Sequence, residues 1–490
     1  MRKLLLIGCL SCLLILTLSA CSRDSDSGSD DNIVYGQVVK TDENKITVES
    51  GSYTYGGSFK SDGEEKCYNL PENVFYDDFK AGDIVSILCD GEDATAVANV
   101  KDVEYRTSSG SSGSGNSGSS GSSNGSGNSD ADSASGAAAS NTVSDFGQTV
   151  QSGVNAARLK ADDESVTVND EYYEVGDDME VGLLALNSGG KITANRTSLT
   201  VSGKNSCGIA AENGAAITGE QINLSCSGEN SIAAATLDGS SVIDLSNSTV
   251  ETESSESPCV ISAGNVSLTS VTLTTQKSSG LAVLPGGVVN LKNSSMTTHG
   301  DTAVELCNTG NLQSGSQSSG LSGRAKFMAN SSSLEAVSNE TLIQVTGIES
   351  FVKMMNTSIT SAASVLADVQ ADEQKNGAKL LLYGVNQEYS GDITCDEDSK
   401  VKLVLTEESS YTGCFDADDS AKYSKVYISK NSKWDVTGDS HVGTLRNGDK
   451  KCRNIQSDGH TVYYDKNREA NDWLEGKTIS LPGGGKLQPE

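Results

Sequence analysis

The chain has 490 residues and a formal charge of −30, because 66 Asp and Glu residues outnumber 36 Lys and Arg residues. This acidity argues against binding to nucleic acid and against electrostatic docking on anionic lipid, since both need basic surfaces. Only 5% of the residues are aromatic and 51 are glycine, which argues against several domains with aromatic cores and favours an extended scaffold with a polar surface.

The first 20 residues have the organisation of a secretory signal. Arg2 and Lys3 are basic, residues 4–17 are apolar, and residues 18–21 read Leu-Ser-Ala-Cys. The apolar run is short for a membrane span and ends in small residues. Residues 18–21 resemble the lipobox of bacterial lipoproteins, which implies cleavage before Cys21 and lipidation of its sulfur; an uncleaved membrane anchor is the alternative. We therefore expect an extracytoplasmic protein that is lipid-anchored to the bacterial cell membrane and exposed at the cell surface.

Three regions of different composition follow the signal. Residues 21–32 are polar and rich in Ser and Asp, which predicts a disordered tether. Residues 33–106 contain strand-like apolar segments separated by Gly, Asp and Asn turns, which predicts a small all-β module. This module resembles small barrel modules of other bacterial lipoproteins. Residues 107–141 are almost entirely Ser, Gly, Asn and Ala, which predicts a flexible linker without a core.

Apolar residues recur in three columns within residues 142–490. The first column opens each repeat, with steps of 23 to 26 residues, at Ile192, Ile217, Ile243, Val266 and Val289. The second lies seven residues later, at Leu199, Leu224, Val250, Leu273 and Met296. The third lies at Ile209, Ile232, Ile261, Leu281 and Val304. Period-two alternation around these positions predicts three short strands per repeat, and therefore a β-solenoid of roughly ten or eleven turns.

Two departures from regular strands carry further expectations. Asn247, Asn293 and Asn356 precede the second strand of their repeats, and Asn tolerates left-handed backbone geometry, which predicts tight corners at these positions. The step from Val289 to Phe327 is 38 residues, and the surplus falls near residues 308–323. It predicts a projecting loop, which either carries binding or is a neutral insertion.

Units such as residues 204–214 resemble the repeats of right-handed parallel β-helix proteins, and residues 432–440 resemble the last turns of adhesin-like rods. Pertactin-like adhesins and the pectin-lyase superfamily share this fold. The resemblance covers about residues 185–465 and implies an all-β protein, namely a right-handed parallel β-helix with terminal caps, preceded by the small barrel-like module. The functions that it implies are adhesion or polysaccharide processing.

The regular repeats offer little that suits catalysis. Residues 298–301 (Thr-His-Gly-Asp) faintly resemble the Gly-His-Gly motif of polygalacturonases, but the accompanying Asn-Thr-Asp and Arg-Ile-Lys elements are missing, so we interpret His299 as a turn residue. The acidic runs 396–398 and 416–419 are candidates for weak Ca²⁺ binding or solvated loop charge. We expect no catalytic residues, no cofactor and no structural metal site.

Aromatic side chains are the usual platform for neutral sugars, because a ring presents a flat apolar face. Residues 174–325 contain none, so a carbohydrate site is expected in the later half of the rod. The candidate ligand-binding residues are Tyr383, Tyr389, Tyr411, Tyr427 and Trp434. Packing in the last turns is the alternative interpretation of all five.

Nine cysteines follow Cys21, without CxxC or CxxH spacing. We expect Cys207 and Cys259 to lie two turns apart, which is too far for a disulfide, and to be free. The leading functional hypothesis is a non-catalytic surface lipoprotein whose rod serves adhesion or ligand binding, with extracellular polysaccharide or a surface protein as partner and no nucleic acid. A lyase or hydrolase of the pectin-lyase superfamily and a structural envelope protein are the alternatives.

Overall fold

The structure is a computed structural model that describes residues 33–53, 59–72, 74–100, 157–308, 321–337 and 340–490. The chain divides into two compact units, which are described here one at a time. The predicted signal peptide with Cys21, the tether, the linker and most of the predicted insertion lie outside the described residues. None of the helices in the described ranges has the length and apolar character that a membrane crossing requires.

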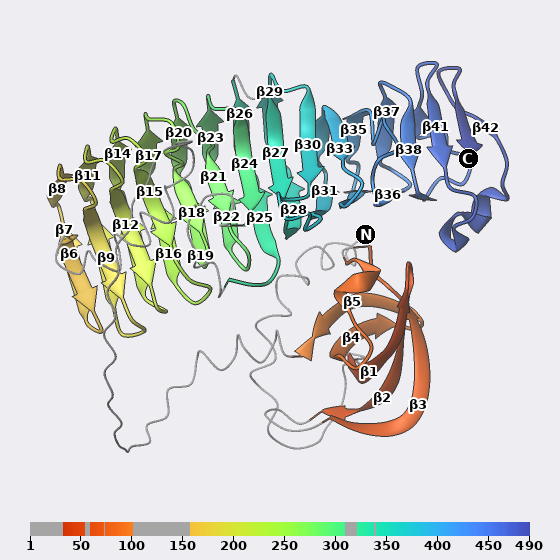
Figure 1. The fold of residues 1–490 in the computed structure, drawn as a ribbon, viewed down its shortest axis with the longest axis horizontal. Helices are drawn as coiled ribbons and strands as arrows, with labels where there is room; N and C mark the ends of the chain where they lie inside the picture. Colours follow the sequence, from red (N-terminus) through yellow and green to blue (C-terminus); the bar gives the residue numbers. More distant parts are fainter. Residues whose placement is uncertain (1–32, 54–58, 73, 101–156, 309–320, 338–339) are drawn as a thin grey trace, which may run out of the picture. The chain divides into compact units, whose positions relative to one another are not determined.

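The first unit contains a closed five-stranded barrel, which confirms the small β module (Figure 1). Its strands, in spatial order, are β1 (Ile33–Asp42), β2 (Lys45–Tyr53), β3 (Phe59–Asn69), β5 (Asp93–Asn99) and β4 (Ile84–Asp90). The barrel closes because β1 pairs antiparallel with both β2 and β4. Side chains such as Val48, Val85 and Ile87 fill its interior, and the short 3₁₀ helix η1 (Tyr76–Asp78) precedes β4.

The second unit is a right-handed parallel β-helix, and the predicted fold class is confirmed (Figure 1). The longest sheet has 12 strands, more than the predicted ten or eleven turns: β7 (Ser165–Asn169), β10 (Lys191–Asn195), β13 (Ala216–Glu220), β16 (Val242–Ser246), β19 (Asn265–Thr269), β22 (Val288–Lys292), β25 (Ala325–Asn330), β28 (Glu349–Met355), β31 (Lys379–Val385), β34 (Lys400–Thr406), β36 (Tyr423–Ile428) and β39 (Thr444–Asn447).

Two further parallel sheets complete most turns. The 8-stranded sheet consists of β8 (Tyr172–Val175), β11 (Ser198–Val201), β14 (Asn223–Cys226), β17 (Thr249–Thr252), β20 (Thr272–Thr275), β23 (Ser295–Thr298), β26 (Ser333–Ala336) and β29 (Ser358–Ser361). The 10-stranded sheet consists of β6 (Ala157–Asp162), β9 (Val181–Leu186), β12 (Cys207–Glu212), β15 (Ile232–Thr236), β18 (Val260–Ser262), β21 (Leu281–Val283), β24 (Thr302–Cys307), β27 (Thr341–Thr346), β30 (Val365–Gln370) and β33 (Asp392–Cys395).

The last turns use two smaller sheets and the 3₁₀ helix η4 (Glu469–Leu474). One sheet consists of β32 (Glu388–Ser390), β35 (Ser410–Gly413), β37 (Lys433–Val436) and β40 (Ile455–Gln456). The other consists of β38 (Ser440–Val442), β41 (Thr461–Tyr464), β43 (Lys486–Pro489) and β42 (Ile479–Ser480), of which only β42 runs antiparallel to its neighbour. Strands therefore continue almost to the end of the chain.

The register of the first two predicted columns is confirmed. Ile192 pairs with Ile217, Leu199 pairs with Leu224, and both ladders continue residue by residue along the predicted positions. The third column is wrong at two positions, because Ile209 pairs with Ala234 instead of Ile232, and Ala234 pairs with Val260 instead of Ile261. The sequence thus predicted that a strand lies there, but not which of its residues point into the core.

The reason for the error is that the 10-stranded sheet is apolar on both faces. Inward positions such as Ile209 belong to the main core, whereas the alternating positions form a second buried cluster on the opposite face. Members of that second cluster include Leu184, Ala210, Ala235, Ile261 and Ala282. When both faces of a strand are apolar, polar and apolar residues no longer alternate along it. The sequence then does not show which residues point into the core.

The corner between the 12-stranded and 8-stranded sheets has left-handed backbone geometry, as predicted. Asn247, Asn293 and Asn356 have φ values of 50°, 50° and 48°. The residue after each corner holds the stack with a buried hydroxyl group. The Ser248 hydroxyl accepts a hydrogen bond from the Ile222 N–H at 2.9 Å and donates one to the Ser246 carbonyl at 2.7 Å. The corner therefore satisfies backbone groups that stacked strands alone leave unpaired.

Substitution of Asn293 by valine tests this geometry. A β-branched side chain in the left-handed region is expected to cost about 1–2 kcal/mol of unfolding free energy. Asn293→Gly is the matched control, since glycine adopts positive φ without steric cost and the side chain at this position is exposed. Urea unfolding of both variants measures the difference, and equal stability of the two would contradict the assigned role of the corner.

Candidate functional site

The outward face of the 12-stranded sheet changes character along the rod. In the early turns its central positions are short and mostly uncharged, namely Thr193, Thr218, Asp244, Ser267 and Asn290. From β25 onward it carries basic side chains, at Lys326, Lys353, Lys379, Lys400, Lys402, Lys425 and Arg446. We call these seven residues, together with Tyr383 and Tyr427, the basic stripe.

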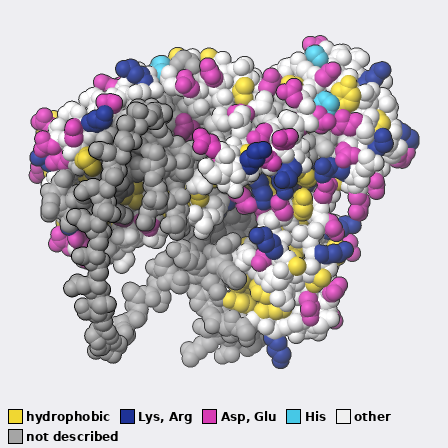
Figure 2. All heavy atoms as spheres, in the orientation of Figure 1, with side chains coloured by type: hydrophobic (Ala, Val, Ile, Leu, Met, Phe, Trp, Pro, Cys, Tyr) yellow, Lys and Arg dark blue, Asp and Glu magenta, His cyan; other side chains and the backbone are white. Residues whose placement is uncertain are grey.

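The basic stripe stands out against a strongly acidic protein. Figure 2 shows Asp and Glu side chains scattered over the visible surface and a group of Lys and Arg side chains near the later strands. On the outward positions of β25, β28, β31, β34, β36 and β39, the one acidic side chain is Glu349, which accepts a hydrogen bond from Lys379 Nζ at 2.8 Å. The net charge of the whole chain therefore conceals a local excess of positive charge.

Pairing register places like charges side by side within the stripe. Lys402 of β34 pairs in register with Lys425 of β36, and Lys379 pairs with Lys400. Neighbouring strands lie about 4.8 Å apart, and like charges at such positions destabilise a sheet. Lys402 and Lys425 are only 3% and 2% exposed although they point away from the solenoid core. A buried ammonium group is stable only beside acceptors, so these two lysines have partners of their own.

Two of the five predicted aromatic residues lie on the stripe. Tyr383 and Tyr427 point outward from β31 and β36 and are half-buried. Lys353 Nζ lies 5.6 Å from the centre of the Tyr383 ring, at cation–π distance. Val404 separates the two tyrosines in the ladder, so they stand two turns apart on one line along the rod, roughly 10 Å from each other.

The other three predicted aromatic residues lie inside the solenoid. Tyr389, Tyr411 and Trp434 are 2%, 0% and 0% exposed, and they pair in register in β32, β35 and β37. The Tyr411 and Trp434 rings stack with centroids 6.0 Å apart. The Tyr411 hydroxyl donates to the Cys414 carbonyl at 2.6 Å, and Trp434 Nε1 donates to the Gly413 carbonyl at 3.1 Å. The structure thus places these three as an internal ladder, which corresponds to the packing interpretation.

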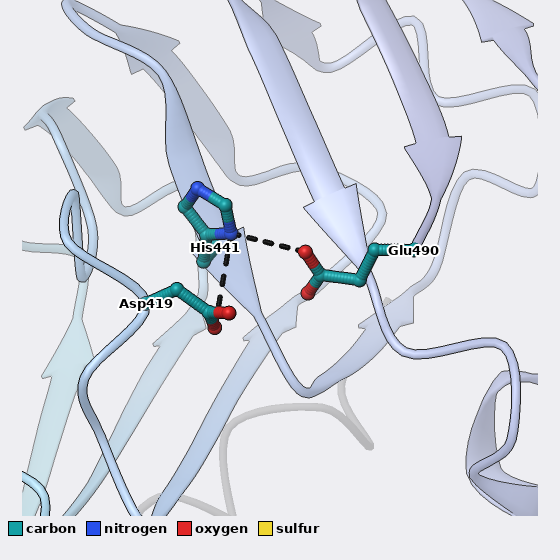
Figure 3. A group of neighbouring side chains, drawn as sticks. All are labelled: Asp419, His441 and Glu490. Atoms are coloured by element: carbon teal, nitrogen blue, oxygen red, sulfur yellow. Dashed lines mark hydrogen bonds and ion pairs between the residues drawn. The ribbon is translucent and has the colours of Figure 1, made fainter.

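A second cluster of functional groups lies near the end of the chain, where Asp419, His441 and Glu490 converge (Figure 3). His441 Nδ1 lies 3.1 Å from Glu490 Oε2 and 3.7 Å from Asp419 Oδ1. The three residues come from the loop after β35, from β38 and from the position after β43. Asp419 belongs to a predicted acidic run, whereas no motif in the sequence predicts that His441 and Glu490 join it.

Two of the six carboxylates that were candidates for Ca²⁺, Asp396 and Asp416, hold turns. Asp396 accepts hydrogen bonds from the Ala371 N–H at 2.7 Å and the Asp398 N–H at 3.2 Å. Asp416 is 2% exposed and accepts hydrogen bonds from the Ser420 and Ala421 N–H groups, and burial raises the pKa of its carboxyl group.

The remaining predicted features are structural. His299 follows β23, where its Nδ1 lies 2.9 Å from the Thr275 carbonyl oxygen. A hollow of about 400 Å³ at the corner of the 12-stranded and 8-stranded sheets is lined by Ser, Thr, Asn and Val and contains no titratable side chain. Cys207 and Cys259 are free as predicted, and burial raises the pKa of the Cys259 thiol to about 12, so it packs as a protonated apolar group.

Comparison with known proteins gives no relationship for this chain: no protein-family model matches it, and a search of curated proteins finds no significant similarity. The fold of a parallel β-helix is common to adhesin-like and pectin-lyase-like proteins, which differ in function. Any functional conclusion therefore rests on the chemistry of the two sites described above.

Proposed function

We propose that the protein is a non-catalytic surface lipoprotein, anchored through Cys21, whose β-helical rod binds an acidic polysaccharide along the basic stripe. The observation that carries this proposal is the gathering of seven basic residues, among them Lys353, Lys379 and Lys400, on one face of an otherwise acidic chain. A ligand with repeating carboxylate, sulfate or phosphate groups complements such a run of ammonium and guanidinium groups.

The aromatic residues favour a polysaccharide over other polyanions. Tyr383 and Tyr427 lie on one line along the rod, with Lys353 before the first ring and Arg446 after the second. An extended acidic sugar chain suits such a line, because each unit combines an apolar ring face with a charged substituent. The basic and aromatic side chains extend over several successive turns, which suits a polymer better than a small ligand.

A binding screen of the chain without its signal, with Cys21→Ser to remove lipidation, tests the proposal. We expect binding to glycans that carry carboxylate, sulfate or phosphate groups, affinity that falls as the salt concentration rises, and no turnover of any bound glycan. Neutral glycans and single-stranded DNA serve as controls on the same array. In cells, Cys21→Ser is expected to release the protein from the membrane fraction, which tests the anchor separately.

Each other outcome of the screen contradicts part of the proposal. Cleavage of a bound glycan would establish the enzymatic alternative of the pectin-lyase superfamily. Binding to neutral glycans alone would contradict the role of the lysines, and tighter binding to DNA would contradict the choice of polysaccharide. Absence of binding to every glycan would favour a structural role in the envelope.

A further inference from the structure

We propose that Asp419, His441 and Glu490 bind one Zn²⁺ ion. The proposal is independent of the polysaccharide site, since it uses none of the residues of the basic stripe. It begins from the convergence of three ligating side chains that are 22 and 49 residues apart in the sequence and project from three separate elements toward one point (Figure 3).

The backbone holds all three residues in place. The Asp419 N–H donates to the Asp416 carbonyl at 3.1 Å, the His441 N–H donates to the Phe415 carbonyl at 3.0 Å, and the Glu490 N–H donates to the Tyr464 carbonyl at 3.0 Å. The imidazole ring of His441 stacks on Tyr463, its in-register neighbour, with centroids 4.6 Å apart and planes inclined by 11°. The ring therefore has a fixed orientation that directs Nδ1 at the two carboxylates.

The distances suit a small transition-metal ion. Zn²⁺ binds imidazole nitrogen and carboxylate oxygen at about 2.0–2.2 Å, usually in tetrahedral geometry, so its ligand atoms lie roughly 3.3–3.6 Å apart. The observed separations of 3.1 Å and 3.7 Å from Nδ1 bracket this range, and the ligand atoms of all three side chains lie within 4.8 Å of one another. Small side-chain adjustments bring them to one ion.

The donor set selects the metal. One neutral imidazole and two carboxylates give a site of charge −2, which attracts a divalent cation. Imidazole nitrogen favours Zn²⁺ and related ions over Ca²⁺ and Mg²⁺, which prefer oxygen ligands only. Three protein ligands leave a fourth position for water or for a group on a partner molecule. Bound Zn²⁺ would also link the loop after β35, strand β38 and the end of β43.

Zinc titration calorimetry of the chain without its signal tests the proposal, in a background with Cys21→Ser and Cys67→Ser, which remove the lipidated and the exposed thiol. We expect one Zn²⁺ per chain and a higher melting temperature when zinc is bound. His441→Gln and Glu490→Gln are each expected to weaken zinc binding by about tenfold or more. Glu490→Gln keeps the size and backbone hydrogen bond, so it tests the ligand without testing the fold.

His460→Gln is the matched control, because His460 Nδ1 lies 3.7 Å from Asp439, and no third ligating side chain among the described residues joins this pair. Its substitution is expected to leave zinc affinity unchanged. Failure of the chain to bind Zn²⁺, or equal loss in His441→Gln and His460→Gln, would overturn the proposal. Binding of Ca²⁺ at this site in preference to Zn²⁺ would overturn the argument from the donor set.

Discussion

Replacing Trp434 by alanine is expected to lower the free energy of unfolding by about 3–5 kcal/mol, because the change leaves a large cavity in the core. Trp434 is fully buried between the rings of Tyr411, stacked at 6.0 Å, and Phe415, which meets it edge to face at 6.4 Å. The change also removes the hydrogen bond that the Gly413 carbonyl oxygen accepts from the indole N–H. Urea unfolding, followed by far-ultraviolet circular dichroism, measures the loss.

Tyr427→Ala is the matched control for this experiment. Tyr427 lies in β36 of the late turns but faces outward and is only half-buried, so its removal is expected to cost much less than that of Trp434, about 1 kcal/mol. A Trp434→Ala variant that kept wild-type stability would contradict the internal ladder. If that variant also lost glycan affinity, Trp434 would regain the ligand-binding role that the sequence suggested for it.

The double substitution Tyr383→Ala and Tyr427→Ala is expected to weaken binding of an acidic glycan by roughly 10²-fold while leaving the fold intact. Each ring contributes on the order of 1–2 kcal/mol if it is an anchor of the interface. This expectation is the reverse of that for Trp434→Ala, which lowers stability but leaves the outward surface unchanged. Fluorescence titration with a glycan identified by the array, beside thermal unfolding, separates the two effects.

Two lysines of the early turns provide the control for charge. Lys191 and Lys292 are exposed on the same face of the same 12-stranded sheet, in β10 and β22, outside the basic stripe. Lys191→Ala with Lys292→Ala removes the same amount of charge as Lys353→Ala with Lys400→Ala. The early pair is expected to have less than about a twofold effect on affinity, and the stripe pair a loss of about tenfold. Equal effects would show that binding depends on net charge alone.

The sequence predicted the solenoid well where each strand has one polar face. In β10 and β11 the residues on either side of Ile192 and Leu199 are polar, so parity is unambiguous and the register follows. In β12 and β15 nearly every residue is buried, so Ile232 and Ile261 were aligned to the wrong neighbours. Two-sided burial is a tertiary property, and no single strand reveals which element covers its second face.

The same limit applies to the sites. Tyr383 and Tyr389 are six residues apart, yet one faces outward and the other lies in the core, because a corner separates their strands. The basic residues of the stripe are dispersed over 121 residues, from Lys326 to Arg446, and only stacking brings them onto one face. A net charge of −30 is a sum over the whole chain, so it does not reveal that one face carries mainly basic side chains.

In-register stacking also determines how such a protein can change length. Strand β13 pairs with β10 and with β16 through the same five residues, so loss of the whole turn 216–241 would place Ile243 directly against Ile192. Loss of half a turn would instead join strands from different sheets. Duplication or deletion is therefore tolerated only in whole turns of about 25 residues. Turns added within the basic stripe would increase the number of contacts that it makes with a polymer, without altering any single contact.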